Sequence, residues 1–146
     1  MSPKILVIED DPTAMDLIVY LLRAFGHQAM TASSGGEGLE VMARELPDLV
    51  LCDILMAGID GYEVARRVKG EPRLRDIPLI AVTALAMVGD RDRMLASGFD
   101  GYVPKPIAPE TFVSEVEKFL RPEQRVARKP EGAVSFRAVL FVSPHA

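Results

Sequence analysis

Cysteine, tryptophan and long apolar segments are scarce or absent in this chain of 146 residues. Cys52 is the single cysteine, so an intramolecular disulfide framework and a metal site built from several thiolates are both excluded. No apolar run reaches the roughly 18 residues that a membrane-spanning helix needs, and the short run Ile5–Ile8 does not resemble a signal peptide. We therefore expect a cytoplasmic protein without a membrane segment, because one unpaired cysteine fits a reducing compartment.

Basic residues are few in the main body of the chain and more frequent near its end. Residues 1–120 contain 12 Lys and Arg against 19 Asp and Glu, whereas residues 121–146 contain five against two. Binding to nucleic-acid phosphates needs clustered cations, so we expect no direct DNA binding by the acidic body. A hydrophobic content of 49% and a charged content of 26% favour one globular domain with an apolar core.

Short apolar segments alternate with amphipathic segments along most of the chain. Continuous apolar runs are typical of strands that are buried on both faces of a parallel sheet. They occur at Ile5–Ile8, Ala29–Ala32, Leu49–Cys52, Leu79–Val82 and Tyr102–Val103. The alternation predicts an α/β fold, a parallel sheet with right-handed crossovers and helices on both faces. Sites in such folds lie beyond the carboxyl ends of the strands.

Capping residues mark several of the expected helix boundaries. Asp11 is a suitable N-cap for a first helix, with Pro12 in its first turn and Gly26 at its exit. Ser34 and Glu37 match a capping box at the start of a second helix. Apolar spacing predicts further helices over Tyr62–Lys69, over Val88–Ser97 and from Pro109 onward.

Charged and hydroxyl side chains follow the predicted strands. Glu9, Asp10 and Asp11 follow the first apolar run, and Asp53 follows the third. Two carboxylates about 4 Å apart repel by roughly 4 kcal/mol at an effective dielectric near 20, so protons or a cation must relieve the repulsion. Lys105 after the fifth run supplies one positive charge. Mg²⁺ is the natural candidate for the rest, because it prefers oxygen ligands and leaves room for a phosphate oxygen.

This set of residues suits phosphoryl transfer. A phosphoryl group at the carboxyl ends of the predicted strands would meet Mg²⁺, Lys105 and the Thr83 hydroxyl. Positioning and charge stabilisation are most of what phosphoryl transfer requires. Asp53 is the best candidate nucleophile, because a carboxylate can form an acyl phosphate and Asp53 stands alone after a buried strand. Asp10 and Asp11 would then hold the metal. Taken singly, each residue also has a structural explanation, such as capping or a turn, and only their joint occurrence indicates function.

Two other residues have structural interpretations. Cys52 is expected to pack as a small core hydrophobe. His27 follows a helix stop, and we expect it at the surface.

Four motifs in order resemble the CheY-like receiver domains of bacterial two-component response regulators, and most of all the stand-alone receivers of the DivK type. The motifs are KILVIEDD, DLVLCDILMAGIDGYE, PLIAVTA and GYVPKPI, within a match over roughly residues 3–121. The resemblance implies a five-stranded parallel sheet of order 2-1-3-4-5 with helices on both faces. It also implies a signalling module that catalyses only its own phosphorylation and dephosphorylation, rather than a separate enzyme.

The resemblance further implies a role for each matching residue. Asp53 would accept a phosphoryl group from a sensor histidine kinase or a histidine phosphotransfer protein. Mg²⁺ would be bound by Asp10, Asp11, Asp53 and the backbone carbonyl of Leu55. The phosphoryl group would be contacted by Lys105, Thr83 and the backbone of Ala84, with Thr83 and Tyr102 as switch residues and a cis peptide bond before Pro106. Phosphorylation would change the surface made by the fourth helix, fifth strand and fifth helix, and so control a downstream protein.

Three positions depart from the family pattern or modify it. Ala57 stands where family members commonly have proline. Leu55 and Leu85 occupy positions that influence how fast the aspartyl phosphate is lost in the family. Because apolar side chains cannot orient an attacking water, we predict slow self-dephosphorylation.

The end of the chain lies outside the resemblance. We expect a receiver domain over residues 1–121, a linker over 122–134, and a strand-like tail over 135–142 with the sequence SFRAVLFV. An exposed segment of this kind promotes aggregation, so it is expected to pair with a sheet edge, within the chain or in a partner. The chain is expected to be a monomer or a weak homodimer.

Two other functions fit part of the sequence, and a third does not. A phosphorylation-independent receiver-like binding module is one alternative, although all the expected residues are present. A Mg²⁺-dependent aspartyl phosphohydrolase is another, but such enzymes usually carry Asp-x-Asp after the first strand, and here the acids are adjacent. Flavin binding is excluded, because Asp10 and Asp11 would repel a phosphate.

Overall fold

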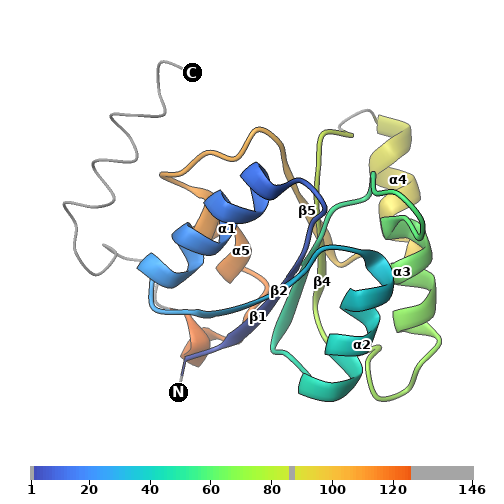
Figure 1. Ribbon diagram of the computed structural model, residues 1–146, viewed down its shortest axis with the longest axis horizontal. Helices are drawn as coiled ribbons and strands as arrows, with labels where there is room; N and C mark the ends of the chain where they lie inside the picture. The colour runs from blue at the N-terminus through green and yellow to red at the C-terminus, as the bar shows by residue number, and fades with distance from the viewer. Residues whose placement is uncertain (1, 86–87, 126–146) are drawn as a thin grey trace.

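The computed structural model describes residues 2–85 and 88–125 (Figure 1). Strands and helices alternate along the described residues, and a short 3₁₀ helix, η1, is the last element among them. The elements are β1 (Lys4–Ile8), α1 (Pro12–Ala24), β2 (Gln28–Ala32), α2 (Gly35–Glu45), β3 (Leu49–Cys52), α3 (Gly61–Lys69), β4 (Leu79–Thr83), α4 (Val88–Ser97), β5 (Gly101–Pro104), α5 (Phe112–Glu117) and η1 (Pro122–Gln124). No helix among these residues is long and apolar enough to cross a membrane.

The strands form one parallel sheet of order β2-β1-β3-β4-β5. This confirms the α/β fold and the strand order expected from the sequence. In the register of the sheet, Ile8 at the end of β1 lies beside Ala32 on one side and Cys52 on the other. The residues that follow β1 and β3 therefore emerge at the same edge of the sheet.

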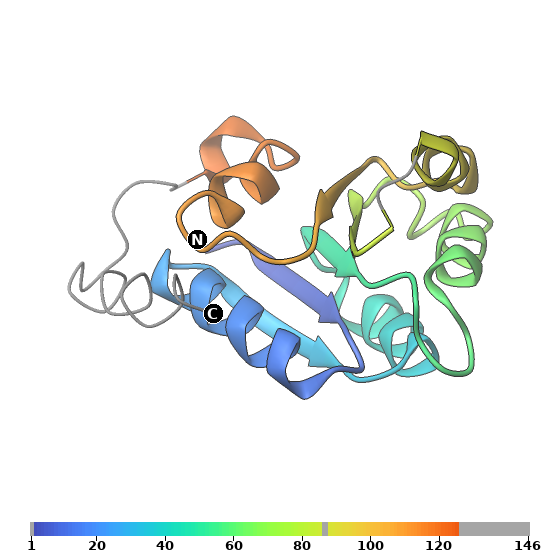
Figure 2. The same ribbon diagram turned by 90° about the horizontal axis from the view of Figure 1, so that it is seen from above.

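Helices cover both faces of the sheet, and each face has its own apolar core (Figure 2). Alternate residues of the central strands supply the two cores: Leu6 and Ile8 face one, and Ile5 and Val7 face the other. The first core contains side chains from α2, α3 and α4, including Met42, Val64 and Met94. The second contains side chains from α1 and α5, including Leu21, Phe112 and Val116. Burial of β1, β3 and β4 on both sides explains their continuous apolar sequences.

The predicted helix caps are largely confirmed. Asp11 is the N-cap of α1, followed by Pro12, and Gly26 has a positive φ of 88° beyond the helix end. Ser34 is the N-cap of α2, and its side chain accepts a hydrogen bond from the Glu37 N–H. The reciprocal half of the capping box differs, because the Glu37 carboxylate accepts from the N–H of Ser33 instead of the N-cap residue.

Two local predictions are wrong. The fifth helix begins at Phe112 rather than at Pro109, because residues 109–111 form a turn in which the Thr111 N–H bonds to the Ala108 carbonyl. His27 is buried, with 3% of its surface exposed, whereas a surface position was expected. Its ring nitrogen Nε2 pairs with the carboxylate of Glu117 on α5, so the side chain is turned toward α5 and away from solvent.

The linker expected over residues 122–134 begins with ordered structure. Residues 122–124 form η1, and the Gln124 side chain donates a hydrogen bond to Asp48 just before β3. Residues 126–134 of the linker and the strand-like tail expected over 135–142 lie outside the described residues.

Candidate functional site

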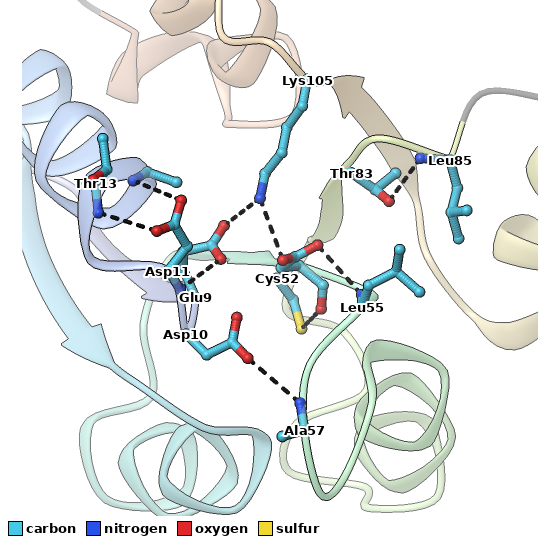
Figure 3. Close-up of polar contacts among 12 residues, drawn as sticks. Glu9, Asp10, Asp11, Thr13, Cys52, Leu55, Ala57, Thr83, Leu85 and Lys105 are labelled. Carbon is cyan, nitrogen blue, oxygen red and sulfur yellow. Dashed lines mark hydrogen bonds and ion pairs between the residues drawn. The ribbon is translucent and has the colours of Figure 1, made fainter.

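Three carboxylates meet where β1 and β3 end (Figure 3). Glu9 and Asp10 directly follow β1, and Asp53 directly follows β3. One carboxylate oxygen from each lies within 4.8 Å of the others. Glu9 and Asp53 are buried and Asp10 is exposed, so the cluster opens to solvent on the Asp10 side.

Lys105, just beyond β5, supplies the positive charge of the site. Its Nζ lies 2.8 Å from Glu9 Oε1 and 3.3 Å from Asp53 Oδ2. Burial disfavours the charged ammonium, but the hydrogen bond to Glu9 and the charge of Asp53 outweigh it, so the pKa of Lys105 is raised. Burial also raises the pKa of Glu9, against the opposing effect of Lys105. One cation therefore leaves the cluster with surplus negative charge.

Asp11, which was expected to be a metal ligand, lies outside this cluster of carboxylates. Its carboxylate oxygens accept hydrogen bonds from the backbone N–H groups of Thr13 and Ala14, at 3.4 and 3.3 Å. These bonds cap α1 and turn the side chain toward its own helix. The Asp11 N–H in turn donates to Glu9 Oε2 at 3.1 Å. The third carboxylate of the cluster is therefore Glu9, which the sequence placed at the strand end without assigning it a role.

The loop after β3 holds two of the carboxylates by backbone hydrogen bonds. Asp53 is 6% exposed, and its Oδ1 accepts from the N–H of Leu55 at 3.3 Å. Asp10 Oδ2 accepts from the N–H of Ala57 at 3.4 Å. A proline at position 57 has no N–H to donate, so the departure from the family pattern adds one contact to Asp10.

Close packing fixes the position of Asp53. A Cβ atom at Gly61, the first residue of α3, would lie only 2.7 Å from the Asp53 carbonyl oxygen, so only glycine allows α3 to approach the loop this closely. Cys52 is fully buried beneath the site, as expected of a core residue. Burial, followed by the charge of Asp53, raises the pKa of its thiol, so Cys52 is held in the unreactive protonated form.

The predicted switch residues lie on β4 and β5. Thr83 is buried at the end of β4, and its hydroxyl accepts a hydrogen bond from the Leu85 N–H at 3.1 Å. Tyr102 on β5 is half-buried, with the Arg91 guanidinium 5.8 Å from its ring centre. The peptide bond between Lys105 and Pro106 is cis, as the resemblance implies. Ala84 is exposed beside Thr83.

The donor set fits a hard divalent cation. All three acidic groups offer oxygen, the surplus charge is negative, and one side of the cluster is open for water or phosphate ligands. The cluster holds no histidine or cysteine ligand of the kind that zinc prefers. The arrangement can therefore bind Mg²⁺ beside a buried carboxylate and an ammonium group.

Comparison with known proteins identifies the family of this chain. The response regulator receiver domain family matches residues 5–117. The polar-differentiation response regulator DivK of Brucella ovis is 36% identical over 120 residues, which cover 82% of this chain and 98% of the relative.

Solved receiver structures are similar over the same region. The receiver domain of a histidine kinase from Syntrophus aciditrophicus has a TM-score of 0.75 and 34% identity, over 82% of this chain and 90% of that chain. The receiver domain of a sensor histidine kinase from Pseudomonas aeruginosa, with magnesium coordinated in its active site cleft, has a TM-score of 0.75 and 28% identity, over 82% of this chain and 98% of that chain. This chain therefore belongs to the receiver domains of response regulators, and its function is in two-component signal transduction.

Proposed function

We propose that Asp53 is the phosphoacceptor of this receiver. The observation that carries the proposal is the position of its buried carboxylate, 3.3 Å from Lys105 Nζ and within 4.8 Å of the acidic groups of Glu9 and Asp10. The donor is a phosphohistidine of a sensor histidine kinase or of a histidine phosphotransfer protein. An Asp53 carboxylate oxygen bonds to phosphorus as the phosphorus–nitrogen bond breaks, and the released imidazole takes up a proton.

Glu9, Asp10 and Asp53 would hold Mg²⁺, together with the backbone carbonyl of Leu55. When bound, the ion neutralises charge on the phosphoryl oxygens and on the acidic cluster. Lys105 stays beside Asp53 and pairs with the transferred phosphoryl group. The backbone N–H of Ala84, which directly follows Thr83, would donate to the same group. Asp11 keeps its place as the cap of α1.

Thr83 and Tyr102 carry the change to the surface. The Thr83 hydroxyl, which accepts from Leu85 here, would donate instead to a phosphoryl oxygen. Its movement vacates space that the half-buried Tyr102 ring can enter. The result biases the surface of α4, β5 and α5 between two arrangements, and a downstream protein reads the difference. No separate substrate is turned over, and the chain acts as a monomer or weak homodimer.

Loss of the phosphoryl group is slow in this proposal. Leu55 is 60% exposed beside Asp53, and Leu85 is half-buried near Thr83. Neither side chain can hydrogen-bond an attacking water, so hydrolysis lacks a residue that orients it.

Intact-mass measurement after treatment with acetyl phosphate and Mg²⁺ tests the phosphoacceptor. The wild-type chain should gain one phosphoryl group and Asp53→Asn none. Asp11→Asn is the matched control, because asparagine caps a helix as well as aspartate does, and it should gain the group like the wild type. A gain in Asp53→Asn would show that another carboxylate is the acceptor, and no gain in any of the proteins would favour a phosphorylation-independent module.

A further inference from the structure

The outer edge of β2 has unpaired strand backbone. Among residues 2–85 and 88–125, β2 pairs only with β1. Gln28 and Ala32 face β1, since the Gln28 N–H bonds to the Pro3 carbonyl and the Ala32 carbonyl accepts from Glu9. Alternate residues of a parallel strand face opposite neighbours, so the backbones of Ala29 and Thr31 face outward.

The outward backbone is only partly covered by a side chain. The Arg23 guanidinium donates to the Ala29 carbonyl at 3.2 Å. A charged side chain on an edge is one way in which proteins discourage pairing with other chains. Thr31 is exposed at the same edge, so this strand can still accept a partner strand there.

A groove runs beside this edge, along α1. Figure 2 shows α1 lying along β2. The groove has a volume of about 850 Å³ and is lined by Met15, Asp16, Val19, Tyr20, Arg23, Ala24 and Thr31. Tyr20 is a large hydrophobic side chain that is 39% exposed in this groove. The groove thus offers apolar surface next to unpaired strand backbone.

The described chain ends near the start of β2. Gln124 of η1 bonds to Asp48, and Asp48 Oδ2 accepts from the Lys4 N–H at the start of β1. The start of β2 is next to it, because the Gln28 N–H bonds to Pro3. Residues 126–134 extend to at most roughly 30 Å at about 3.3 Å per residue, which is enough to bring the following segment to the β2 edge.

The segment 135–142, SFRAVLFV, has a composition that favours pairing as a β-strand. It holds β-branched, aromatic and apolar residues, no proline and one charge. Alternation along a strand places one fully apolar set on a single face: Phe136, Ala138, Leu140 and Val142. The end of the chain is basic and the body acidic, so charge also favours their association.

We propose that residues 135–142 add to the sheet of their own chain as a sixth strand beside β2. The outward backbone of Ala29 and Thr31 takes the strand hydrogen bonds, and the apolar face with Leu140 covers the groove along α1. A strand that starts at the start of β2 runs parallel to it. Pairing within one chain is favoured over pairing between chains, because the short linker gives an effective concentration of roughly millimolar.

Amide hydrogen exchange of the full-length chain, followed residue by residue by NMR, tests this pairing. The Thr31 amide should exchange at least about tenfold more slowly in the wild type than in Leu140→Asp. Ser143→Asp is the matched control, because it adds the same charge just outside the segment, and it should behave like the wild type. The Met30 amide, which faces β1, reports that the domain is folded and should be protected in all three proteins.

Analytical ultracentrifugation at several protein concentrations measures the oligomeric state, and so shows whether the added strand comes from the same chain or from a second copy. A monomer with a protected Thr31 amide supports the proposal. Protection that appears only as a dimer forms would overturn it in favour of pairing between copies. Equal Thr31 exchange in the wild type and Leu140→Asp would overturn the strand itself. None of these readouts depends on phosphorylation, so they are independent of the role of Asp53.

Discussion

His27, just before β2, and Glu117, at the end of α5, form a buried side-chain hydrogen bond across 90 positions of sequence. Only 3% of His27 and 2% of Glu117 are exposed. Among the described residues, the other ring nitrogen of His27, Nδ1, has no hydrogen-bond partner. The pair therefore connects α5 to the beginning of the edge strand through a contact that water cannot easily replace.

Breaking this contact should destabilise the fold. Removing one partner of a buried hydrogen bond leaves the other partner unsatisfied, which costs about 1–3 kcal/mol. We expect Glu117→Ala to lower the free energy of unfolding in urea by about that amount. The exposed control Glu110→Ala should change it by less than about 0.5 kcal/mol. A double-mutant cycle with His27→Ala that shows no coupling between the two residues would contradict the prediction.

The metal site can be tested by comparing two acids that are two positions apart. Glu9→Gln should weaken Mg²⁺ binding by about tenfold or more, because it removes a charge from the cluster. Asp11→Asn should leave the affinity unchanged, since Asp11 caps α1 and lies outside the cluster. Calorimetric titration with Mg²⁺ measures both. The reverse pattern would restore Asp11 as the ligand.

Lys105 and a bound cation should compete electrostatically. Lys105 Nζ contacts both Glu9 and Asp53, so its charge repels a second cation in the cluster. We expect Lys105→Met to bind Mg²⁺ several-fold more tightly than the wild type in the same titration, and to be less stable without Mg²⁺. Weaker Mg²⁺ binding in Lys105→Met would show that the ammonium group mainly organises the ligands.

Stability of the metal-free protein should depend on pH through Glu9. Burial raises the pKa of this carboxyl above its ordinary value of 4.5, so between that value and the raised one the folded state binds more protons than the unfolded state. The contribution of Glu9 to stability is therefore present at lower pH and is lost as pH rises through this window. Urea denaturation in the presence of a chelator at several pH values should show that Glu9→Gln loses less stability than the wild type as pH rises through this window. Identical pH dependence in both proteins would rule out this contribution.

The acyl phosphate should be long-lived. Purified wild-type protein, phosphorylated in Mg²⁺, should keep its phosphoryl group well beyond a few seconds, as measured by intact mass over time. Leu55→Asn places a side chain that can hydrogen-bond a water beside Asp53, and it should shorten the lifetime. A wild-type lifetime of a few seconds or less would count against the role given to Leu55 and Leu85.

Local sequence was sufficient for the sheet and for most of the site. The strands β1, β3 and β4 are buried on both faces, so their apolar character is continuous and visible without a structure. Asp53 directly follows β3 and Lys105 directly follows β5, and parallel strands bring their carboxyl ends to one edge. Their proximity could therefore be predicted from chain order alone, as the 3.3 Å contact confirms.

Which acid joins the cluster was decided by the path of the backbone after β1. Glu9, Asp10 and Asp11 are three consecutive acidic residues, and the sequence does not show which of their side chains point into the site. In the folded chain, the Glu9 side chain points into the site. Asp11 is the N-cap of α1, and its carboxylate accepts hydrogen bonds from two backbone N–H groups of that helix. The capping role of Asp11 could be predicted from its position before Pro12, whereas the direction of its side chain, away from the cluster, could not.

The sheet and the residues at the strand ends could be predicted from the amino-acid sequence, because they depend on local apolar patterning and chain direction, and the strand order followed from the family resemblance. The burial of His27 and the grouping of Glu9, rather than Asp11, with Asp10 and Asp53 became visible only in the folded chain. These features depend on contacts between segments far apart in the chain and on the direction of individual side chains, and local periodicity carries neither kind of information.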